Sequence, residues 1–283
     1  MNNAVLLISC SDAKGITASV TDFVFKNNGN IVHADQHIDA RTNTFFMRIE
    51  WSLEGFALQR DQIAESMRPI ADQFDMSWEL HFTQRKERVA VFVSKHLHCL
   101  HDLLYRHKAG HFSCEIPLVI SNHRDAEAMV KGHKIKFACI PKDLSNKSKQ
   151  EEKELDVLKK EKIDVIVLAR YHQIFSDDFV KHYPQRMINI HHSFLPSFAG
   201  KNPYAQAYEK GVKIIGATSH YVTKDLDQGP IIEQDIVRVS HRDNVQDLVR
   251  KGEDLEKIVL SRAVRWHLDK RILVYNRKTV VFD

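Results

Sequence analysis

The 283-residue sequence has few cysteines, and none of them is arranged as cysteines usually are when they act together. The four are Cys10, Cys99, Cys114 and Cys139, and no two of them form a CxxC pair. Most lie within or beside apolar runs, as reduced core thiols do. The sequence therefore argues against a disulfide framework and favours a cytoplasmic protein.

Long hydrophobic runs are also missing. No apolar stretch approaches the roughly 20 residues that span a bilayer. The first apolar run, AVLLIS, is too short for a signal peptide and has no basic lead-in. We expect neither a membrane span nor a signal peptide.

Charge of one sign does not dominate the chain. The 41 basic and 37 acidic residues leave a formal charge of +4, distributed in mixed-sign runs rather than in one basic stripe. Nucleic acid is therefore not the expected partner. The length allows two domains of ordinary size, and the sequence contains no internal repeat.

Residues 1–83 alternate between strand and helix patterns in the order βαββαβ. Strands are expected at 4–9, 30–39, 42–52 and 77–82, and helices at about 15–28 and 56–74. This order suits a ferredoxin-like α/β sandwich. The predicted linker is 84–88, because the segment TQRKER is wholly polar or charged.

Residues 89–283 change to short, almost wholly apolar strands separated by helix-length segments. These strands are expected at 89–94, 116–121, 136–141, 164–169 and 187–190. Such a pattern predicts a Rossmann-like, open, mostly parallel sheet. Paired strands at 213–222 and 230–239 and a helix near 244–269 would extend it, and the charged segment EEKELDVLKKEK is typical of a helix with a solvated polar face.

Polar side chains interrupt the sequence where the last parallel strand ends, in INIHHSF. In an extended segment side chains alternate, so Asn189 and His191 should share one face while His192 points to the other. A metal site would need both imidazoles to converge on one ion. The alternation therefore disfavours a histidine metal pair. Ligands bind beyond the carboxyl ends of strands in such sheets, and the 164–169 strand ends in a second polar segment, ARYHQIF.

Asp227 is the carboxylate that best completes this set. Gly229 and Pro230 favour a turn that fixes its position, although an aspartate before glycine is often only a turn residue. The side chains of Asn189 and His191 can donate hydrogen bonds to a carbonyl oxygen as it becomes an oxyanion, and a carboxylate can orient and deprotonate a nucleophile. Together these residues suit acyl chemistry.

Two other polar clusters have simpler interpretations. His98 and His101 share a helix face at i, i+3 spacing, but Cys99 should point elsewhere on the helix, so we interpret them as a polar helix edge. In SDAKGIT, a helix N-terminus could seat an anion, yet Asp12 as a simple N-cap suffices.

Several of these motifs resemble the folate-dependent formyltransferase family. The resemblance rests on INIHHSFLPSFAGKNPYAQA and GVKIIGATSHYVTKDLDQGPIIEQ, while VSKHLHCLHDLLYR, PLVISNH and LARYHQI are similar to its formyltetrahydrofolate deformylase branch. Residues 6–39 are similar to an ACT domain, which that branch carries. The separation of Asn189 from Asp227 agrees with the family's catalytic spacing.

The resemblance implies hydrolysis of 10-formyltetrahydrofolate to tetrahydrofolate and formate. This would supply formate for purine synthesis and balance the one-carbon folate pool. It assigns Asn189 and His191 to binding the formyl oxygen, and Asp227 to positioning water and transferring protons. No metal is implied, and no cofactor beyond the folate substrate, because folate itself supplies the leaving group.

The resemblance also implies a folate-binding loop in ARYHQIF, with two neighbours that support Asp227 and the loop. The implied substrate-binding residues are Tyr171, Gln173, Ile174, Phe175, His220 and Thr223. The sequence departs from the branch at His172, where methionine is more usual, and this leaves the packing of the folate pocket open.

The same catalytic residues would also serve formyl transfer to an amine. Family members that hold a ribonucleotide phosphate carry a Gly- and Ser-rich turn after the first strand, whereas this chain has SKHLHCL, with only Lys95 to attract a phosphate. A transferase acting on tRNA would need a further RNA-binding domain. A non-catalytic amino-acid sensor is the other alternative, since the ACT-like domain implies an amino-acid effector near SDAKG and a homo-oligomer.

Overall fold

The computed structural model describes residues 2–143, 145–196 and 203–283, and it divides the chain into two compact units. The first comprises Met1–Lys86, Asp269–Leu273 and Val280–Asp283, and the second Glu87–Leu268 and Val274–Thr279. The predicted motif residues 197–202 lie outside the described residues. The prediction assigned every residue after the 84–88 linker to the second domain, whereas the structure assigns two C-terminal segments to the first unit.

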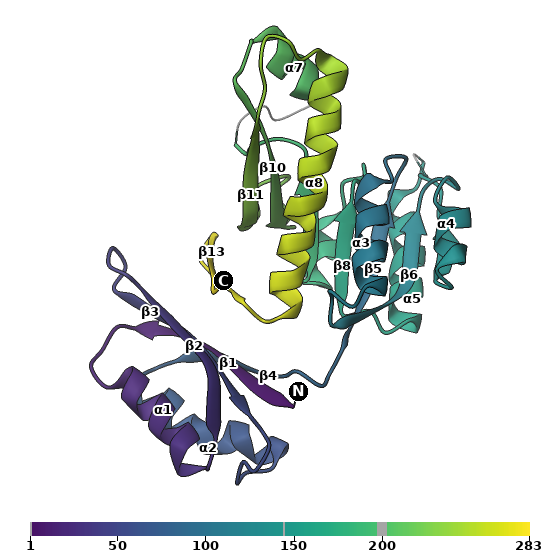
Figure 1. Ribbon diagram of the computed structural model, residues 1–283. Coiled ribbons are helices and arrows are strands. Elements are labelled where there is room, and N and C mark those ends of the chain that lie inside the picture. Colours follow the sequence, from purple (N-terminus) through teal and green to yellow (C-terminus); the bar gives the residue numbers. More distant parts are fainter. Residues whose placement is uncertain (1, 144, 197–202) are drawn as a thin grey trace. The chain divides into compact units, whose positions relative to one another are not determined.

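The first unit has the predicted βαββαβ order. Its elements are β1 (Asn3–Ser11), α1 (Ile16–Lys26), β2 (Asn30–Asp39), β3 (Thr44–Ser52), α2 (Arg60–Gln73) and β4 (Ser77–Phe82). The strands form an antiparallel sheet in the order β2-β3-β1-β4. Figure 1 shows α1 and α2 on one face of this sheet. The ferredoxin-like sandwich is confirmed.

The start of α1 differs from the prediction. The helix begins at Ile16, after Gly15 in a left-handed conformation (φ 97°), and no side chain caps it. Asp12 lies too far upstream to be the N-cap, and its backbone N–H donates to the carbonyl of Asn43 (2.8 Å). The interpretation of Asp12 as a cap was wrong, because glycine makes the left-handed turn that starts the helix three residues later.

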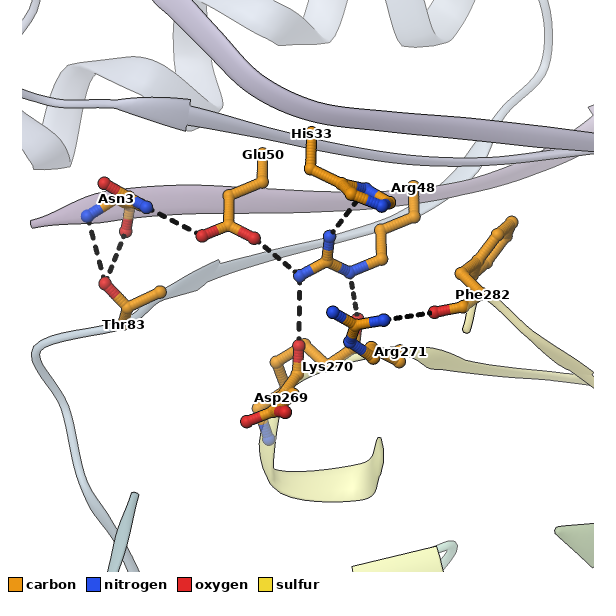
Figure 2. Close-up of polar contacts among 9 residues, drawn as sticks. All are labelled: Asn3, His33, Arg48, Glu50, Thr83, Asp269, Lys270, Arg271 and Phe282. Carbon is orange, nitrogen blue, oxygen red and sulfur yellow. Dashed lines mark hydrogen bonds and ion pairs between the residues drawn. The ribbon is translucent and has the colours of Figure 1, made fainter. Parts of the chain in front are cut away.

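The other face of the first sheet carries a buried arginine (Figure 2). Arg48 is 2% exposed. Its guanidinium donates to the carbonyl oxygens of Lys270 (2.9 Å) and Asp269 (3.1 Å) and pairs with Glu50 (2.8 Å). Glu50 also accepts a hydrogen bond from Asn3 (2.7 Å). Arg48 therefore binds the C-terminal part of this unit to its sheet.

The second unit is built on a seven-stranded sheet in the order β11-β10-β9-β8-β5-β6-β7. Its elements are β5 (Glu87–Val93), α3 (His98–Lys108), β6 (Cys114–Ser121), α4 (Glu127–Gly132), β7 (Lys136–Cys139), α5 (Lys147–Lys160), β8 (Val165–Ala169), α6 (Asp177–Lys181), β9 (Met187–His191), α7 (Pro203–Glu209), β10 (Ile214–Tyr221), β11 (Ile231–Arg238) and α8 (Val245–Leu268). A separate hairpin joins β12 (Ile272–Tyr275) to β13 (Lys278–Val281).

The strand directions confirm the predicted open, mostly parallel sheet with an antiparallel extension. Strands β5 to β9 are parallel, whereas β10 is antiparallel to β9 and β11 is antiparallel to β10. The chain runs outward from β5 to β7 and then returns to β8 on the other side of β5. In such sheets the crevice at this reversal, beyond the carboxyl ends of the strands, is where ligands bind.

Helix α5 has the expected solvated polar face, which includes the exposed Glu152, Lys153 and Lys159, but its opposite face also buries polar side chains. Gln150, Glu151 and Glu154 are all buried, Glu154 completely. They lie on a helix that also contributes Leu158 to the core over β5, β6 and β8. In the described parts of the chain, no helix combines the length and apolar character that crossing a membrane requires.

Candidate active site

One cavity of about 770 Å³ lies beyond the carboxyl ends of β8 and β9. Its volume is in the range of small-molecule sites. The structure brings to this cavity every residue predicted for the site: Asn189, His191, Asp227, Tyr171, Gln173, Ile174, Phe175, His220 and Thr223.

Asn189 and His220 face each other across the β9–β10 ladder, where they are direct partners. The Asn189 Nδ2 atom lies 3.2 Å from His220 Nε2. His220 Nδ1 lies 3.0 Å from the carbonyl oxygen of Tyr221, so Nδ1 carries a proton and Nε2 can accept. One N–H of Asn189 is thus engaged, and the other remains for a further acceptor.

His191 ends β9 with its ring 92% withdrawn from solvent. Its Nδ1 atom lies 3.3 Å from Asp227 Oδ2. Its Nε2 atom is buried and has no hydrogen-bond partner among the residues that the structure describes. A buried ring nitrogen without a partner is costly, and this one can meet a carbonyl oxygen in the cavity.

Asp227 is held as a carboxylate by the two histidines. Burial by itself would raise its pKa, but the hydrogen bond from His191 and the neighbouring ring of His220 lower the pKa of Asp227 well below the ordinary aspartate value. It is therefore ionised throughout the physiological pH range.

The loop that carries Asp227 is fixed by backbone geometry. Asp227 itself takes the left-handed conformation (φ 55°), and Thr223 Oγ1 donates to the carbonyl of Asp225 (3.1 Å). A Cβ at Gly229 would lie 1.7 Å from the carbonyl oxygen of Tyr221, so only glycine fits there. Gly229 thus lets the loop approach β10 closely, and the left-handed backbone conformation occurs at Asp227 instead.

His192 does not point away from His191, as the alternation predicted. Its ring stacks on His191 with 5.1 Å between centroids, and it lines the same cavity. The prediction was wrong because β9 ends at His191, and strict alternation holds only within a strand. Burial, followed by the positive charge of Arg170, lowers the pKa of His192 to about 3.

The segment after β8 forms an aromatic wall of the cavity. The ring of Phe175 stacks on Tyr171 (5.7 Å between centroids) and on Phe179 (4.2 Å), and it meets Phe92 edge-on (5.7 Å). Ile174 is 60% exposed. An exposed aliphatic side chain beside stacked rings offers a surface for a flat ring system.

A buried carboxylate that the sequence did not reveal holds this wall in place. Glu154 Oε1 accepts hydrogen bonds from Tyr171 Oη and Gln150 Nε2, both at 2.9 Å. Gln173 is bonded to both of those donors, at 3.0 and 2.9 Å. Burial raises the pKa of Glu154. In the sequence Glu154 is one charge among many in a helix, and only its burial distinguishes it.

A second group that sequence reasoning missed surrounds Arg170, a residue of the cavity wall. His98 Nε2 is 2.7 Å from Glu256 Oε2, and Tyr204 Oη donates to Glu256 Oε1 (2.6 Å). Arg170 Nε lies 3.5 Å from the same Oε2 atom. Although burial alone would raise it, the hydrogen bond from His98 and the charge of Arg170 lower the pKa of Glu256. The predicted polar edge of α3 is thus wrong for His98, which is paired with a buried acid.

The same group contains a possible set of metal ligands. Ligand atoms of His98, Cys99 and Glu256 lie within 4.8 Å of one another, so Cys99 does not point elsewhere as predicted. Both carboxylate oxygens of Glu256 are engaged, however, and the Arg170 guanidinium lies against one of them. Burial also raises the pKa of the Cys99 thiol well above its ordinary value. The donor set fits an ion-pair cluster better than a cation site.

His172 lies in the cavity wall. Its ring meets that of His96 edge-on (5.6 Å between centroids), and its backbone N–H donates to Ser94 Oγ (3.1 Å). His172 occupies the position where methionine is more usual in the branch that the sequence resembles. Its polar ring packs against the imidazole of His96.

Comparison with known proteins places these observations in a family. The model of the formyl transferase family matches residues 87–264. The chain is 53% identical over 279 residues to the formyltetrahydrofolate deformylase of Synechocystis, covering 99% of this chain and 98% of that protein. It matches the crystal structure of a formyltetrahydrofolate deformylase from Pseudomonas syringae with a TM-score of 0.97 and 46% identity, over 100% and 95% of the two chains. A glycinamide ribonucleotide transformylase from Symbiobacterium toebii covers 72% of this chain and 98% of its own, with a TM-score of 0.67 and 27% identity.

Proposed function

The chain belongs to the formyl transferase family and to its formyltetrahydrofolate deformylases, and on this premise we propose that it hydrolyses 10-formyltetrahydrofolate to tetrahydrofolate and formate. One observation carries the residue assignment. Asn189, His191 and Asp227 converge on one cavity, where Asn189 Nδ2 keeps one N–H beyond its contact with His220 and His191 Nε2 has no hydrogen-bond partner among the described residues.

In the proposed reaction the formyl oxygen lies between Asn189 Nδ2 and His191 Nε2. Both atoms donate hydrogen bonds in the imidazolium form of His191, whose Nδ1 faces the Asp227 carboxylate at 3.3 Å. The hydrogen bonds from these two donors become stronger as the carbonyl becomes an oxyanion, and this lowers the free-energy barrier to attack on the formyl carbon.

Water is the proposed nucleophile, and Asp227 orients it. The low pKa makes Asp227 a weak base, so the proton leaves water only as the oxygen bonds to the formyl carbon and becomes acidic. That proton passes through Asp227 to N10, the C–N10 bond breaks, and tetrahydrofolate is released with formic acid, which gives up the second proton of the water to solvent and becomes formate. Water, folate and these side chains supply every atom of this scheme.

The aromatic wall is the proposed folate site. Ile174 and Phe175 would pack on the pterin, while Gln173 and Tyr171, held by Glu154, keep the wall in position. His220 and Thr223 would act indirectly, His220 through Asn189 and Asp227, and Thr223 through the loop that carries Asp227.

The turn after β5 favours hydrolysis over transfer to a phosphorylated amine. It contains no glycine, His96 lines the cavity, and His98 is bound to Glu256. Side chains rather than bare backbone N–H groups therefore occupy the place where a phosphate would be cradled.

The proposal is tested by incubating the purified protein with 10-formyltetrahydrofolate, with and without glycinamide ribonucleotide, and measuring formate and tetrahydrofolate. We expect formate release that does not depend on the ribonucleotide. Product that forms only with the ribonucleotide would establish a transferase instead. Asp227→Asn should retain folate binding and lose most turnover, and normal turnover in this variant would contradict the role of Asp227.

We further propose that the first unit binds a small amino acid near residues 11–15, that the chain forms a homo-oligomer, and that it acts in the cytoplasm. The βαββαβ order supports the first two points, and the four free cysteines are consistent with the third. Calorimetric titration with each of the common amino acids, and light scattering with and without the one that binds, test the effector and the assembly.

A further inference from the structure

Arg170 is a largely buried cation, and two of its guanidinium nitrogens have no hydrogen-bond partner among the described residues. Its side chain is 10% exposed and it lines the same cavity as Asn189 and His191. The Nε and Nη1 atoms are buried and have no hydrogen-bond partner in residues 2–143, 145–196 and 203–283. Buried polar groups are nearly always paired, and a charged one without partners requires a specific explanation.

The carboxylate of Glu256 offsets the charge of Arg170 but is too far away to accept a good hydrogen bond from it. The nearest approach, Nε to Oε2, is 3.5 Å, which is longer than a good N–H···O hydrogen bond. The carboxylate is already committed, because Oε2 pairs with His98 at 2.7 Å and Oε1 accepts from Tyr204 at 2.6 Å. The cluster thus holds the guanidinium in place and leaves its N–H groups available.

The backbone holds Arg170 in the cavity wall directly after β8. It is the first residue after β8 and takes the left-handed conformation (φ 63°), which is uncommon for a bulky residue. Its carbonyl oxygen accepts a hydrogen bond from the backbone N–H of Ser94 (3.3 Å), which joins the ends of β5 and β8. Strain of this kind persists where the surrounding structure requires one orientation.

The other charged and titratable groups around the cavity do not serve as an acid partner for Arg170. Asp227 is engaged by His191 and His220, and Asp225 lies on the same loop. The rings of His96, His172 and His192 line the cavity near the guanidinium. A small anion is therefore the partner that this environment lacks.

We infer that Arg170 is a binding site for formate, the carboxylate product, at the end of the cavity formed by Arg170, His96 and His192. This inference rests on the proposed hydrolysis, which converts the neutral formyl group to a carboxylate by forming a C–O bond to water and breaking the C–N10 bond. Near neutral pH the product is the anion. A planar carboxylate matches two N–H groups of a guanidinium, whereas the uncharged formyl group does not. Arg170 thus distinguishes the product from the substrate.

Formate binding to the resting protein is the direct test. Sodium formate is titrated into the protein by calorimetry at constant ionic strength, with acetate, nitrate and chloride as comparison anions. We expect one formate per chain, weaker binding of the other three anions, and product inhibition by formate. Arg170→Gln should weaken formate binding about tenfold or more, and Arg170→Lys, which keeps the charge but loses the planar fork, should lie between.

The surface substitution Arg124→Met is the matched control, because Arg124 is 75% exposed and pairs with Glu127 on the surface. It should leave formate binding unchanged. Equal binding of formate by the parent and by Arg170→Gln, or equal binding of chloride and formate by the parent, would overturn the inference. Should Arg170→Gln not fold, Arg170→Lys still decides the question, since full formate affinity in that variant excludes the planar pairing.

The test separates this inference from the proposed function. Asp227→Asn should lose turnover and still bind formate through Arg170. If the parent binds formate but releases none from 10-formyltetrahydrofolate, the proposed function fails while the anion site stands. If it hydrolyses the substrate and Arg170→Gln binds formate normally, only the assignment of Arg170 fails.

Discussion

The two units each bury an arginine, and the two arginines are bonded in opposite ways. In the first unit every guanidinium nitrogen of Arg48 has a partner: Nε meets the carbonyl of Lys270, Nη2 meets Asp269 and Glu50, and Nη1 lies 3.3 Å from His33 Nδ1. In the second unit Arg170 has one ion pair at 3.5 Å, and its Nε and Nη1 atoms lack hydrogen bonds to the described residues.

The difference indicates that Arg48 stabilises the fold, whereas Arg170 is available to bind a ligand. A buried charge is expensive to desolvate, and good geometry with several hydrogen bonds is needed to offset that cost. Arg48 meets this condition within its own unit, whereas Arg170 does not. The following predictions test the comparison by changing the partners of each arginine.

Arg48→Met should have the largest effect, a loss of about 4 kcal/mol in the free energy of unfolding. The substitution leaves Glu50 without its cation and removes the hydrogen bonds that Arg48 donates to the carbonyl oxygens of Lys270 and Asp269. Urea unfolding followed by fluorescence measures the loss, and the exposed Arg124→Met should change stability by under about 1 kcal/mol. Similar values for the two variants would show that the hydrogen bonds of Arg48 are not structural.

His192→Gln should change how stability depends on pH. The pKa of His192 is lowered to about 3, so between that value and the ordinary histidine pKa the unfolded chain binds a proton that the folded chain does not. The stability that neutral His192 contributes is fully present above the histidine pKa of the unfolded chain. It is lost as pH falls toward the pKa of His192 in the folded chain, at up to about 1.4 kcal/mol per pH unit. From pH 6.5 to pH 5 this amounts to about 2 kcal/mol.

The parent should therefore lose more stability over that range than His192→Gln, as measured by urea unfolding at each pH. Parallel pH profiles of the two proteins would contradict the assignment to His192. Removing the charge of Arg170 should make the profile shallower as well, because Arg170 is the largest cause of the lowered pKa after burial.

Arg170→Met should lower the free energy of unfolding by less than Arg48→Met does when formate is absent, although it removes the cation beside the buried Glu256. Few hydrogen bonds are lost, and Glu256 keeps those of His98 and Tyr204. Urea unfolding in buffers free of carboxylates measures the effect, and formate should raise the midpoint for the parent but not for the variant. A loss as large as that of Arg48→Met would remove the contrast between the two arginines.

Glu154→Gln should have the smallest effect at neutral pH. Burial raises the pKa of Glu154, so the stability linked to its proton is fully present below the unfolded pKa and is lost as pH rises through the folded value. The glutamine variant should lack this loss between pH 5 and pH 8. A steeper decline in the variant than in the parent would show that Glu154 is needed as a carboxylate.

Much of the fold could be predicted because the spacing of apolar residues along the chain indicates the helices and strands. Alternating and wholly apolar runs indicated both sheets, and the polar residues at the ends of β8 and β9 indicated the site. The errors arose where a local rule ended. His192 lies one residue beyond its strand, and Glu154 belongs to a helix whose charges look alike in sequence.

The sequence by itself determined the order of the elements and the positions of Asn189, His191 and Asp227 relative to the strand ends. Only the tertiary structure decided which buried charges are satisfied. Arg48 meets carbonyl groups more than 200 residues away along the chain, while Arg170 meets a carboxylate too far from its N–H groups to bond them well. Hydrogen bonding depends on tenths of an ångström between distant segments, and no pattern along the chain encodes such distances.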